Sequence, residues 1–219
     1  PSNPTGKVYS RGELEAIVEI ANHYNLFIIT DEMYEHFTYD GKKHISIATL
    51  PGARERTISI FGVSKAYCMT GWRIGYIHAD KALVDQIFKV HDSLITCPTA
   101  VSQYAAVEAL CGPQNAVHEF AKAFDTRRKL VMKEIAHSKH LKMAPCEGAY
   151  YAFVKVTPEV DDYELAIRLI KEAGVAVVPG SAFGLGGAGH IRISFCVPEE
   201  DLKEGMRRLV TYLDDYFAG

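Results

Sequence analysis

The spacing of apolar residues predicts alternating helices and strands in the first third of the chain. Ser10 and Glu13 have the spacing of a helix capping box, and apolar residues follow at helical intervals, namely Leu14, Ile17, Val18 and Ala21. Residues 26–30 and 57–61 are short apolar runs, typical of strands buried on both faces in a parallel or mixed sheet. Residues 72–79 indicate a third strand. Because ligands gather at strand ends in such sheets, the residues that follow these strands are candidates for a site.

The middle of the chain is predicted to be helical. Asp80 caps a stretch that runs through Leu94, and a second helix extends from about Thr99 to Leu110. Residues 114–138 predict a long amphipathic helix, whose apolar positions include Phe120, Phe124, Leu130 and Ile135. A helix of this length often connects two domains.

The last third predicts a small α+β layer domain. Strands are expected over residues 150–156, 175–178 and 191–195. A helix is expected over residues 163–173, with Gly174 ending it. Pro198 opens a final helix that places four apolar residues on one face, Leu202, Met206, Leu209 and Leu213.

Composition excludes several classes of protein. The 219 residues carry a net charge of -3, so no nucleic-acid partner is expected. The five cysteines form no CxxC pair, which favours reduced thiols in a cytoplasmic protein. No apolar run is long enough to cross a bilayer, and no signal peptide is recognised. The chain begins at Pro1 without Met, as a segment cut from a longer protein would.

Four short patterns carry residues with chemical potential. Taken singly, the first three have ordinary interpretations as a turn, a cap after a strand, and solvated charges. The fourth is less ordinary, because a buried guanidinium in an apolar strand needs an anionic partner. The patterns are Asn3-Pro4-Thr5-Gly6, Asp31-x-x-Tyr34, Ser64-Lys65 with Arg73 in the segment GWRIG, and Arg192 in the segment IRISF.

In this order, the four patterns resemble the class I/II aminotransferases, which are pyridoxal-phosphate (PLP) enzymes of fold type I in the aspartate-aminotransferase-like group. The resemblance runs from Asn3 to the final helix, and residues 64–76, SKAYCMTGWRIGY, are its most specific segment. It implies the C-terminal portion of such an enzyme, lacking the N-terminal half.

The fold class that the resemblance implies is α/β. Residues 1–112 are expected to form part of the large PLP-binding domain, with a mixed, mostly parallel sheet and helices. Residues 113–138 are expected to form the long connecting helix. Residues 139–219 are expected to form the small α+β C-terminal domain.

The resemblance assigns Lys65, Asp31 and Tyr34 to catalysis around the cofactor ring. Lys65 matches the lysine that forms the Schiff base with PLP and later moves the substrate proton. Asp31 matches the carboxylate that raises the pKa of the pyridine nitrogen and keeps it protonated. Tyr34 and Asn3 match the two hydrogen-bond donors to the ring oxygen O3′.

The remaining matches concern anionic groups of cofactor and substrate. Ser64 and Arg73 match the phosphate ligands, and a guanidinium suits a phosphate dianion. Arg192 matches the arginine that holds the α-carboxylate of the substrate by a bidentate contact, and Asn3 belongs to the same substrate site.

The activity implied is amino transfer between an L-amino acid and a 2-oxo acid, by an enzyme that forms a homodimer at full length. Two alternatives remain on the same scaffold: a PLP-dependent C–S β-lyase, and an aminotransferase-like sensor domain of a transcription regulator that binds PLP without turnover. The complete residue set favours an enzyme. Residues 1–219 alone are expected to be inactive, because the family's N-terminal half supplies part of the phosphate site and the aromatic residue that stacks on the ring.

Two further patterns are interpreted structurally. The glycine-rich segment 184–189 precedes a predicted strand instead of opening a helix, so it is expected to be a loop near the substrate entrance and not a dinucleotide fingerprint. His137 and His140 have no supporting cluster of carboxylates or cysteines, so no metal site is predicted.

Overall fold

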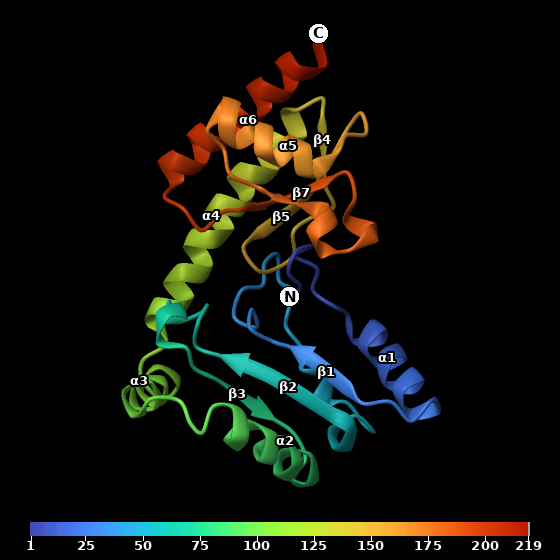
Figure 1. Ribbon diagram of the computed structural model, residues 1–219, viewed down its shortest axis with the longest axis vertical. Helices are drawn as coiled ribbons and strands as arrows, with labels where there is room; N and C mark the ends of the chain where they lie inside the picture. The colour runs from blue at the N-terminus through green and yellow to red at the C-terminus, as the bar shows by residue number, and fades with distance from the viewer. Residues whose placement is uncertain (219) are drawn as a thin grey trace. The chain divides into compact units, whose positions relative to one another are not determined.

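A computed structural model describes residues 1–218, which divide into two units (Figure 1). Unit 1 consists of Pro1–Lys7, Tyr39–Gly41 and Ala121–Gly219, and unit 2 consists of Val8–Thr38 and Lys42–Phe120. Both units are therefore discontinuous in sequence. The domain boundaries expected near residues 112 and 138 stay a prediction.

Unit 2 begins with α1 (Arg11–His23), and its capping box is confirmed. The Ser10 hydroxyl accepts a hydrogen bond from the Glu13 backbone N–H, and the Glu13 carboxylate accepts one from the Ser10 N–H at 2.8 Å. The apolar face of α1 packs on β1 (Ile28–Asp31) and on a short 3-10 turn (Ile47–Thr49). This core consists of Leu14, Val18, Ala21, Ile28, Ile47, Leu50 and Ala53.

The sheet of unit 2 has the order β1-β2-β3 (Figure 1). β1 pairs with β2 (Thr57–Gly62) in parallel, and β2 pairs with β3 (Gly75–His78) antiparallel, so the expected mixed sheet is confirmed. The third strand begins later than expected. Arg73 adopts a left-handed conformation with φ 51°, which prevents an extended backbone before Gly75.

The expectation that the first two strands are buried on both faces is wrong for residues 1–218. Ile28 is 9% exposed, whereas Ile29, on the opposite face of the strand, is 69% exposed. Ile60 in β2 is also 37% exposed. Successive side chains of a strand point to opposite faces, and α1 covers only one of them.

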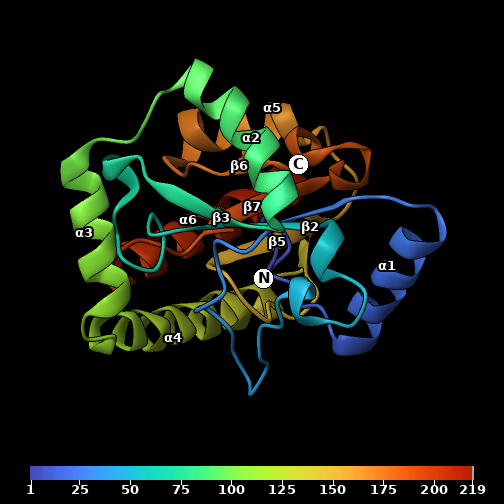
Figure 2. The same ribbon diagram turned by 90° about the horizontal axis from the view of Figure 1, so that it is seen from below.

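Three helices follow the sheet. α2 (Lys81–Leu94) begins at Asp80, whose side chain accepts from Ala82 N, and α3 (Ala100–Cys111) begins at Thr99 and ends at Gly112, as expected. α2 lies beside β3 (Figure 1 and Figure 2), and an open groove of about 490 Å³ is lined by residues of both. α4 (Asn115–His137) is one continuous helix, visible along the lower edge of Figure 2.

Unit 1 contains an antiparallel sheet of order β4-β5-β7-β6. Its strands are β4 (Leu141–Lys142), β5 (Tyr151–Val156), β6 (Val178–Pro179) and β7 (His190–Ser194). The expected strand over residues 175–178 is wrong except at its last residue. The Val175 N–H donates to the Leu169 carbonyl at 3.0 Å, which ties the start of the expected strand to the end of the preceding helix. Only Val178 and Pro179 therefore pair with β7.

Helices complete unit 1. α5 (Asp162–Arg168) continues as a π-type turn to Ala173 and ends at Gly174, whose φ is +66°. α6 (Glu199–Ala218) buries the predicted apolar face, namely Leu202, Met206, Leu209 and Leu213. No helix within residues 1–218 combines the length and apolarity needed to cross a membrane.

We predict that Leu213→Ala lowers the free energy of unfolding by about 2–5 kcal/mol, because it removes buried methyl groups and leaves a cavity. Leu213 is fully buried, whereas Leu185 is 99% exposed and provides the matched control. Leu185→Ala should change the same quantity by less than about 0.5 kcal/mol. Urea unfolding followed by circular dichroism measures both. Equal losses for the two variants would contradict the assignment of the core.

Candidate functional site

Four of the expected cofactor residues lie at one edge of the unit 2 sheet. Asp31 ends β1 opposite Ile60, and the parallel strands β1 and β2 both end at this edge. Ser64 and Lys65 follow β2 directly after Gly62 and Val63. Gly62 pairs with Gly75, so Arg73, just before β3, returns to the same edge.

The segment after β2 is a tight turn that leaves Lys65 half-buried. Thr70 Oγ1 donates to the Ser64 carbonyl at 3.0 Å, and the Cys68 N–H donates to the Lys65 carbonyl at 3.3 Å. Cys68 and Arg73 have positive φ angles of 54° and 51°. Non-glycine residues in this region cost energy and cluster at functional sites. Within residues 1–218, the Lys65 side chain has no hydrogen-bond or ion-pair partner, so its amine is available.

A buried glutamate holds the segment that follows β1. The Glu32 N–H donates to the Ile60 carbonyl at 2.9 Å, and its carboxylate is 1% exposed. That carboxylate lies 2.6 Å from His44 Nε2 and accepts from Ser46 Oγ at 2.9 Å. Burial alone would raise the pKa of Glu32, but these hydrogen bonds outweigh burial and hold the pKa below its ordinary value.

The anchored segment carries both Asp31 and Tyr34. Asp31 Oδ1 accepts from the Met33 N–H at 3.1 Å, and Tyr34 is 6% exposed. The Met33 side chain packs on Gly62, where a Cβ would lie 2.9 Å from Met33 Cε. The strand end that carries Asp31 is therefore held against the strand end that precedes Lys65.

Unit 1 brings two of the expected residues into direct contact. Arg192 lies in β7, and its Nη1 donates to Asn3 Oδ1 at 2.9 Å. The guanidinium carbon lies 4.4 Å from the ring centre of Tyr151 and 5.1 Å from that of Phe183. Arg192 Nε is buried and has no hydrogen-bond partner among residues 1–218. Because a buried unpaired N–H is costly, this guanidinium fits an added acceptor such as a carboxylate.

The turn that carries Asn3 is docked on a loop of unit 1. The Gly6 carbonyl accepts from the N–H groups of Glu147 and Gly148 at 3.0 and 2.8 Å. Gly6 has φ +69°, and a Cβ there would lie 2.7 Å from Cys146 Sγ. Only glycine satisfies both constraints, and the docked turn brings Asn3 to Arg192.

The expected residues thus form two groups. Asp31, Ser64, Lys65 and Arg73 share one sheet edge in unit 2, with Tyr34 in the segment after β1. Asn3 and Arg192 are hydrogen-bonded in unit 1. The roles assigned to all seven residues stay a prediction. In the described part of the chain, no three His, Cys, Asp or Glu side chains are grouped as a metal site would require.

Comparison with known proteins settles the family. The model for aminotransferase class I and II matches residues 1–209. The chain belongs to this family. An aspartate aminotransferase of Pyrococcus abyssi is 42% identical over 212 residues, covering 95% of the chain and 54% of the relative. Aromatic-amino-acid aminotransferase 2 of Thermococcus litoralis is 40% identical over 218 residues, covering 98% of the chain and 56% of the relative.

Solved structures give the same assignment. The aromatic aminotransferase from Pyrococcus horikoshii OT3 matches with a TM-score of 0.95 and 41% identity, over 99% of this chain and 58% of that one. The aspartate aminotransferase from Rhizobium meliloti matches with a TM-score of 0.91 and 37% identity, over 98% and 56%. The α/β fold expected from the sequence is confirmed. The chain spans about half the length of the curated aminotransferases it matches.

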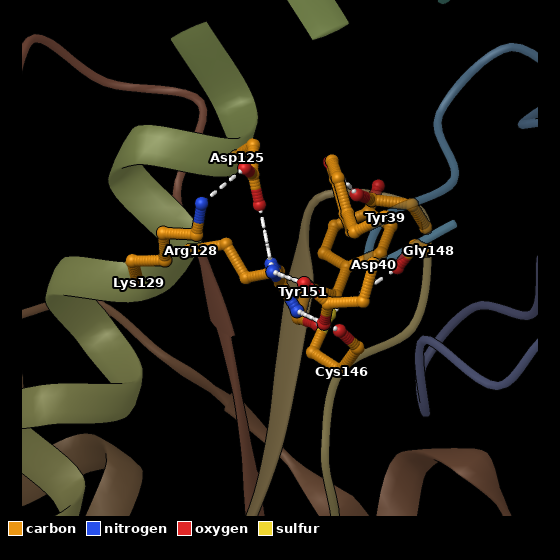
Figure 3. Close-up of polar contacts among 9 residues, drawn as sticks. Tyr39, Asp40, Asp125, Arg128, Lys129, Cys146, Gly148 and Tyr151 are labelled. Atoms are coloured by element: carbon orange, nitrogen blue, oxygen red, sulfur yellow. Dashed lines mark hydrogen bonds and ion pairs between the residues drawn. The ribbon is translucent and has the colours of Figure 1, made fainter. Parts of the chain in front are cut away.

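A buried arginine in this aminotransferase-family chain joins α4 to the segment around Asp40 and to the loop around Cys146 (Figure 3). Arg128 in α4 is 2% exposed and makes two hydrogen bonds to Asp40, at 2.7 and 2.8 Å. It also contacts Asp125 at 2.9 and 2.7 Å and donates to the Cys146 carbonyl at 2.8 Å. Its guanidinium lies 4.7 Å from the ring centre of Tyr39. These contacts use all five N–H groups of the side chain.

Two groups in this network, Asp40 and Cys146, have shifted pKa values. The hydrogen bonds from Arg128 hold the pKa of Asp40 below its ordinary value. Burial raises the pKa of the Cys146 thiol to about 11, so the thiol stays protonated. Cys146 Sγ can then donate to the carbonyls of Gly148 and Tyr151, which lie at 3.2 and 3.1 Å.

Sequence reasoning missed Arg128, although a signal was present. Arg128 lies four residues after Phe124 and three before Val131, on the apolar face of a helix. A charged residue at such a position indicates a buried side chain with anionic partners. The same holds for Arg192, which lies in an apolar strand. Glu32 offered no comparable signal. It directly follows Asp31 at a strand end, where a second acidic residue is expected to be solvated.

We predict that Arg128→Lys lowers the free energy of unfolding by about 1–3 kcal/mol, because an ammonium cannot serve every acceptor and leaves the buried Cys146 carbonyl unpaired. The neighbouring Arg127 contacts the Phe124 ring at 5.7 Å and provides the matched control. Arg127→Lys should cost less than about 1 kcal/mol. Denaturant unfolding measures the free energy of unfolding of both variants. An unchanged value for Arg128→Lys would show that the Arg128 network does not stabilise unit 1.

Proposed function

We propose that the protein carrying this chain transfers an amino group between an L-amino acid and a 2-oxo acid, with PLP bound at Lys65. The observation that carries the proposal is the register of β1, β2 and β3, which gathers Asp31, Ser64, Lys65 and Arg73 at one sheet edge. Membership of the class I and II aminotransferases supports it.

The donor set at this edge fits PLP. The cofactor requires an amine, a carboxylate for its ring nitrogen, and cationic or hydroxyl groups for its phosphate. Lys65 offers the amine and Asp31 the carboxylate. Ser64 and Arg73 offer a hydroxyl and a guanidinium.

When bound, PLP supplies an aldehyde carbon for covalent attachment and an aromatic ring that accepts electrons from the substrate. Asp31 would keep the ring nitrogen of bound PLP protonated. Glu32 fixes the segment in which Asp31 lies. Lys65 Nζ would hold the cofactor and, once the substrate amine has displaced it as a free amine, would take the proton from the substrate α-carbon. The Tyr34 hydroxyl would stabilise the negative charge at O3′ of the bound cofactor.

The guanidinium of Arg192 binds the α-carboxylate common to amino acids and 2-oxo acids. Its buried Nε and remaining η N–H groups form the fork that a carboxylate matches. The Asn3 amide oxygen occupies one N–H and thereby orients the fork. Amino and oxo acids share this group, so one site serves both halves of the exchange.

We predict that borohydride treatment of the PLP-loaded natural gene product leaves a phosphopyridoxyl group on Lys65, because reduction fixes the attached cofactor. Peptide mass mapping locates the label. Lys65→Ala should abolish both the label and amino transfer to 2-oxoglutarate.

Lys81 provides the control for the labelling, since its side chain is 85% exposed and pairs with Asp85 on the surface of α2. Lys81→Ala should keep the label and the activity. A label that maps to a lysine other than Lys65 would refute the proposal. Release of the substrate side chain with formation of ammonia, in place of an amino acid product, would indicate the lyase reaction.

We predict that Arg192→Ala raises KM for amino and oxo acids roughly 10- to 150-fold, the equivalent of a lost charge-assisted contact of about 1.5–3 kcal/mol. The absorption spectrum of bound PLP should be unchanged, because the effect falls on the substrate. Arg208→Ala, on the exposed face of α6, is the control and should leave KM unchanged. Normal kinetics for Arg192→Ala would exclude this arginine from the carboxylate site.

A further inference from the structure

Asp162 is a buried carboxylate that the proposed reaction does not use. It lies at the first position of α5 and is 4% exposed. The neighbouring Asp161 already caps this helix, accepting from the N–H groups of Tyr163 and Glu164 at 3.0 Å. Asp162 is therefore not required as a cap. Burying a carboxylate costs free energy unless hydrogen bonds compensate for it. The groups that donate to Asp162 therefore indicate what this side chain stabilises.

The partners of Asp162 are the two ends of one loop. Oδ1 accepts hydrogen bonds from the backbone N–H and hydroxyl of Ser181, and Oδ2 accepts from the Gly189 N–H at 2.7 Å. Between these ends lies the glycine-rich segment that the sequence predicted to be a loop. One carboxylate thus fixes the start and the end of residues 181–189.

The neck of the loop is closed by a second contact. Gly180 and Gly187 pack so tightly that a Cβ on Gly180 would lie 2.1 Å from the Gly187 carbonyl oxygen. Both residues are buried. No other residue type fits this approach, so the path of the loop is defined by Asp162 and the two glycines.

This loop delivers Phe183 to Arg192. The Phe183 ring lies 5.1 Å from the Arg192 guanidinium carbon and 6.0 Å, edge-on, from the Phe153 ring. Gly189, held by Asp162, directly precedes β7, which contains Arg192. Asp162 therefore fixes both the ring beside the guanidinium and the start of the strand that carries it.

We propose that Asp162 is a positioning residue for carboxylate binding, acting through the loop 181–189 and Phe183 on Arg192. The inference rests on the proposed role of Arg192. Phe183 shields the guanidinium from water and restricts its rotation, so that Nε and the free η N–H groups face an incoming carboxylate. Without the Asp162 hydrogen bonds, the contact between Gly180 and Gly187 remains, but Ser181 and Gly189 are released and the Phe183 ring loses its fixed position beside the guanidinium.

The test measures binding of two carboxylates that carry no amine, succinate and 3-phenylpropionate, to the PLP-loaded natural gene product by calorimetry. Asp162→Asn should weaken the Kd of at least one on the order of ten-fold, because an amide cannot accept from all three donors and binding depends steeply on geometry. KM for amino and oxo acids should rise in parallel while kcat stays within about two-fold. Borohydride labelling of Lys65 should be unchanged.

Asp161→Asn is the matched control, since it changes the adjacent carboxylate at the same helix start. It removes part of the cap and should lower thermal stability while leaving both Kd values unchanged. If Asp162→Asn fails to fold, Ser181→Ala takes its place, because it removes one donor to the same carboxylate.

A double-mutant cycle with Phe183→Ala separates positioning from general destabilisation. In the Phe183→Ala background, Asp162→Asn should have little further effect on Kd, because the ring through which it acts is absent. Unchanged Kd for Asp162→Asn, or equal effects in both backgrounds, would overturn the inference. Failure of Arg192→Ala to weaken carboxylate binding would instead overturn the proposed role of Arg192, so the two failures are distinguishable.

Discussion

The hydrogen bonds of the buried Arg128 guanidinium hold the separate segments of unit 1 together. Its five N–H groups join α4 to the Tyr39–Gly41 segment through Asp40 and to the loop after β4 through the Cys146 carbonyl. That loop accepts the turn that carries Asn3. It also leads into Tyr151, the ring beneath Arg192. Two of the groups that surround the candidate carboxylate site are thus held in place by one buried charge.

Arg128 and Arg192 show how the same side chain serves structure or binding according to its partners. Arg128 has an acceptor for every donor, so it has no capacity for a ligand. Arg192 has one side-chain acceptor, Asn3, and a buried Nε without any within residues 1–218. A fully paired buried charge contributes rigidity, whereas an incompletely paired one retains the potential to bind an anion.

The sequence predicted local structure well where neighbouring residues decide it. The capping box at Ser10, the cap at Asp80 and the stop at Gly174 depend on contacts within a few residues. Prediction failed where pairing and covering elements decide: β6 pairs with β7 only at Val178 and Pro179, and the exposed side of β1 depends on which elements cover the sheet.

The residues of the candidate site also differ in how far the sequence predicts them. The seven residues expected from the family resemblance stand in motifs that can be recognised in a linear sequence. Arg128 was missed although its place on the apolar face of a helix was a signal, whereas Glu32 and Asp162 had none, because their importance comes from burial and from partners outside their local segments. Asp162 is held to Gly189, for example, across 27 residues, and no local pattern marks that pairing. Supporting residues of this kind become visible only when the chain is folded.

The discontinuity of unit 1 sets an order for its assembly during synthesis. Asn3 and Arg192 are separated by 189 residues, which a ribosome takes roughly 10–40 s to add at about 5–20 residues per second. The N-terminal turn therefore emerges long before the loop and strand that receive it. The segments of unit 2 are complete by Phe120, so they can make their contacts while Asn3 is still hydrated. The carboxylate-binding group is consequently among the last parts of the chain to form.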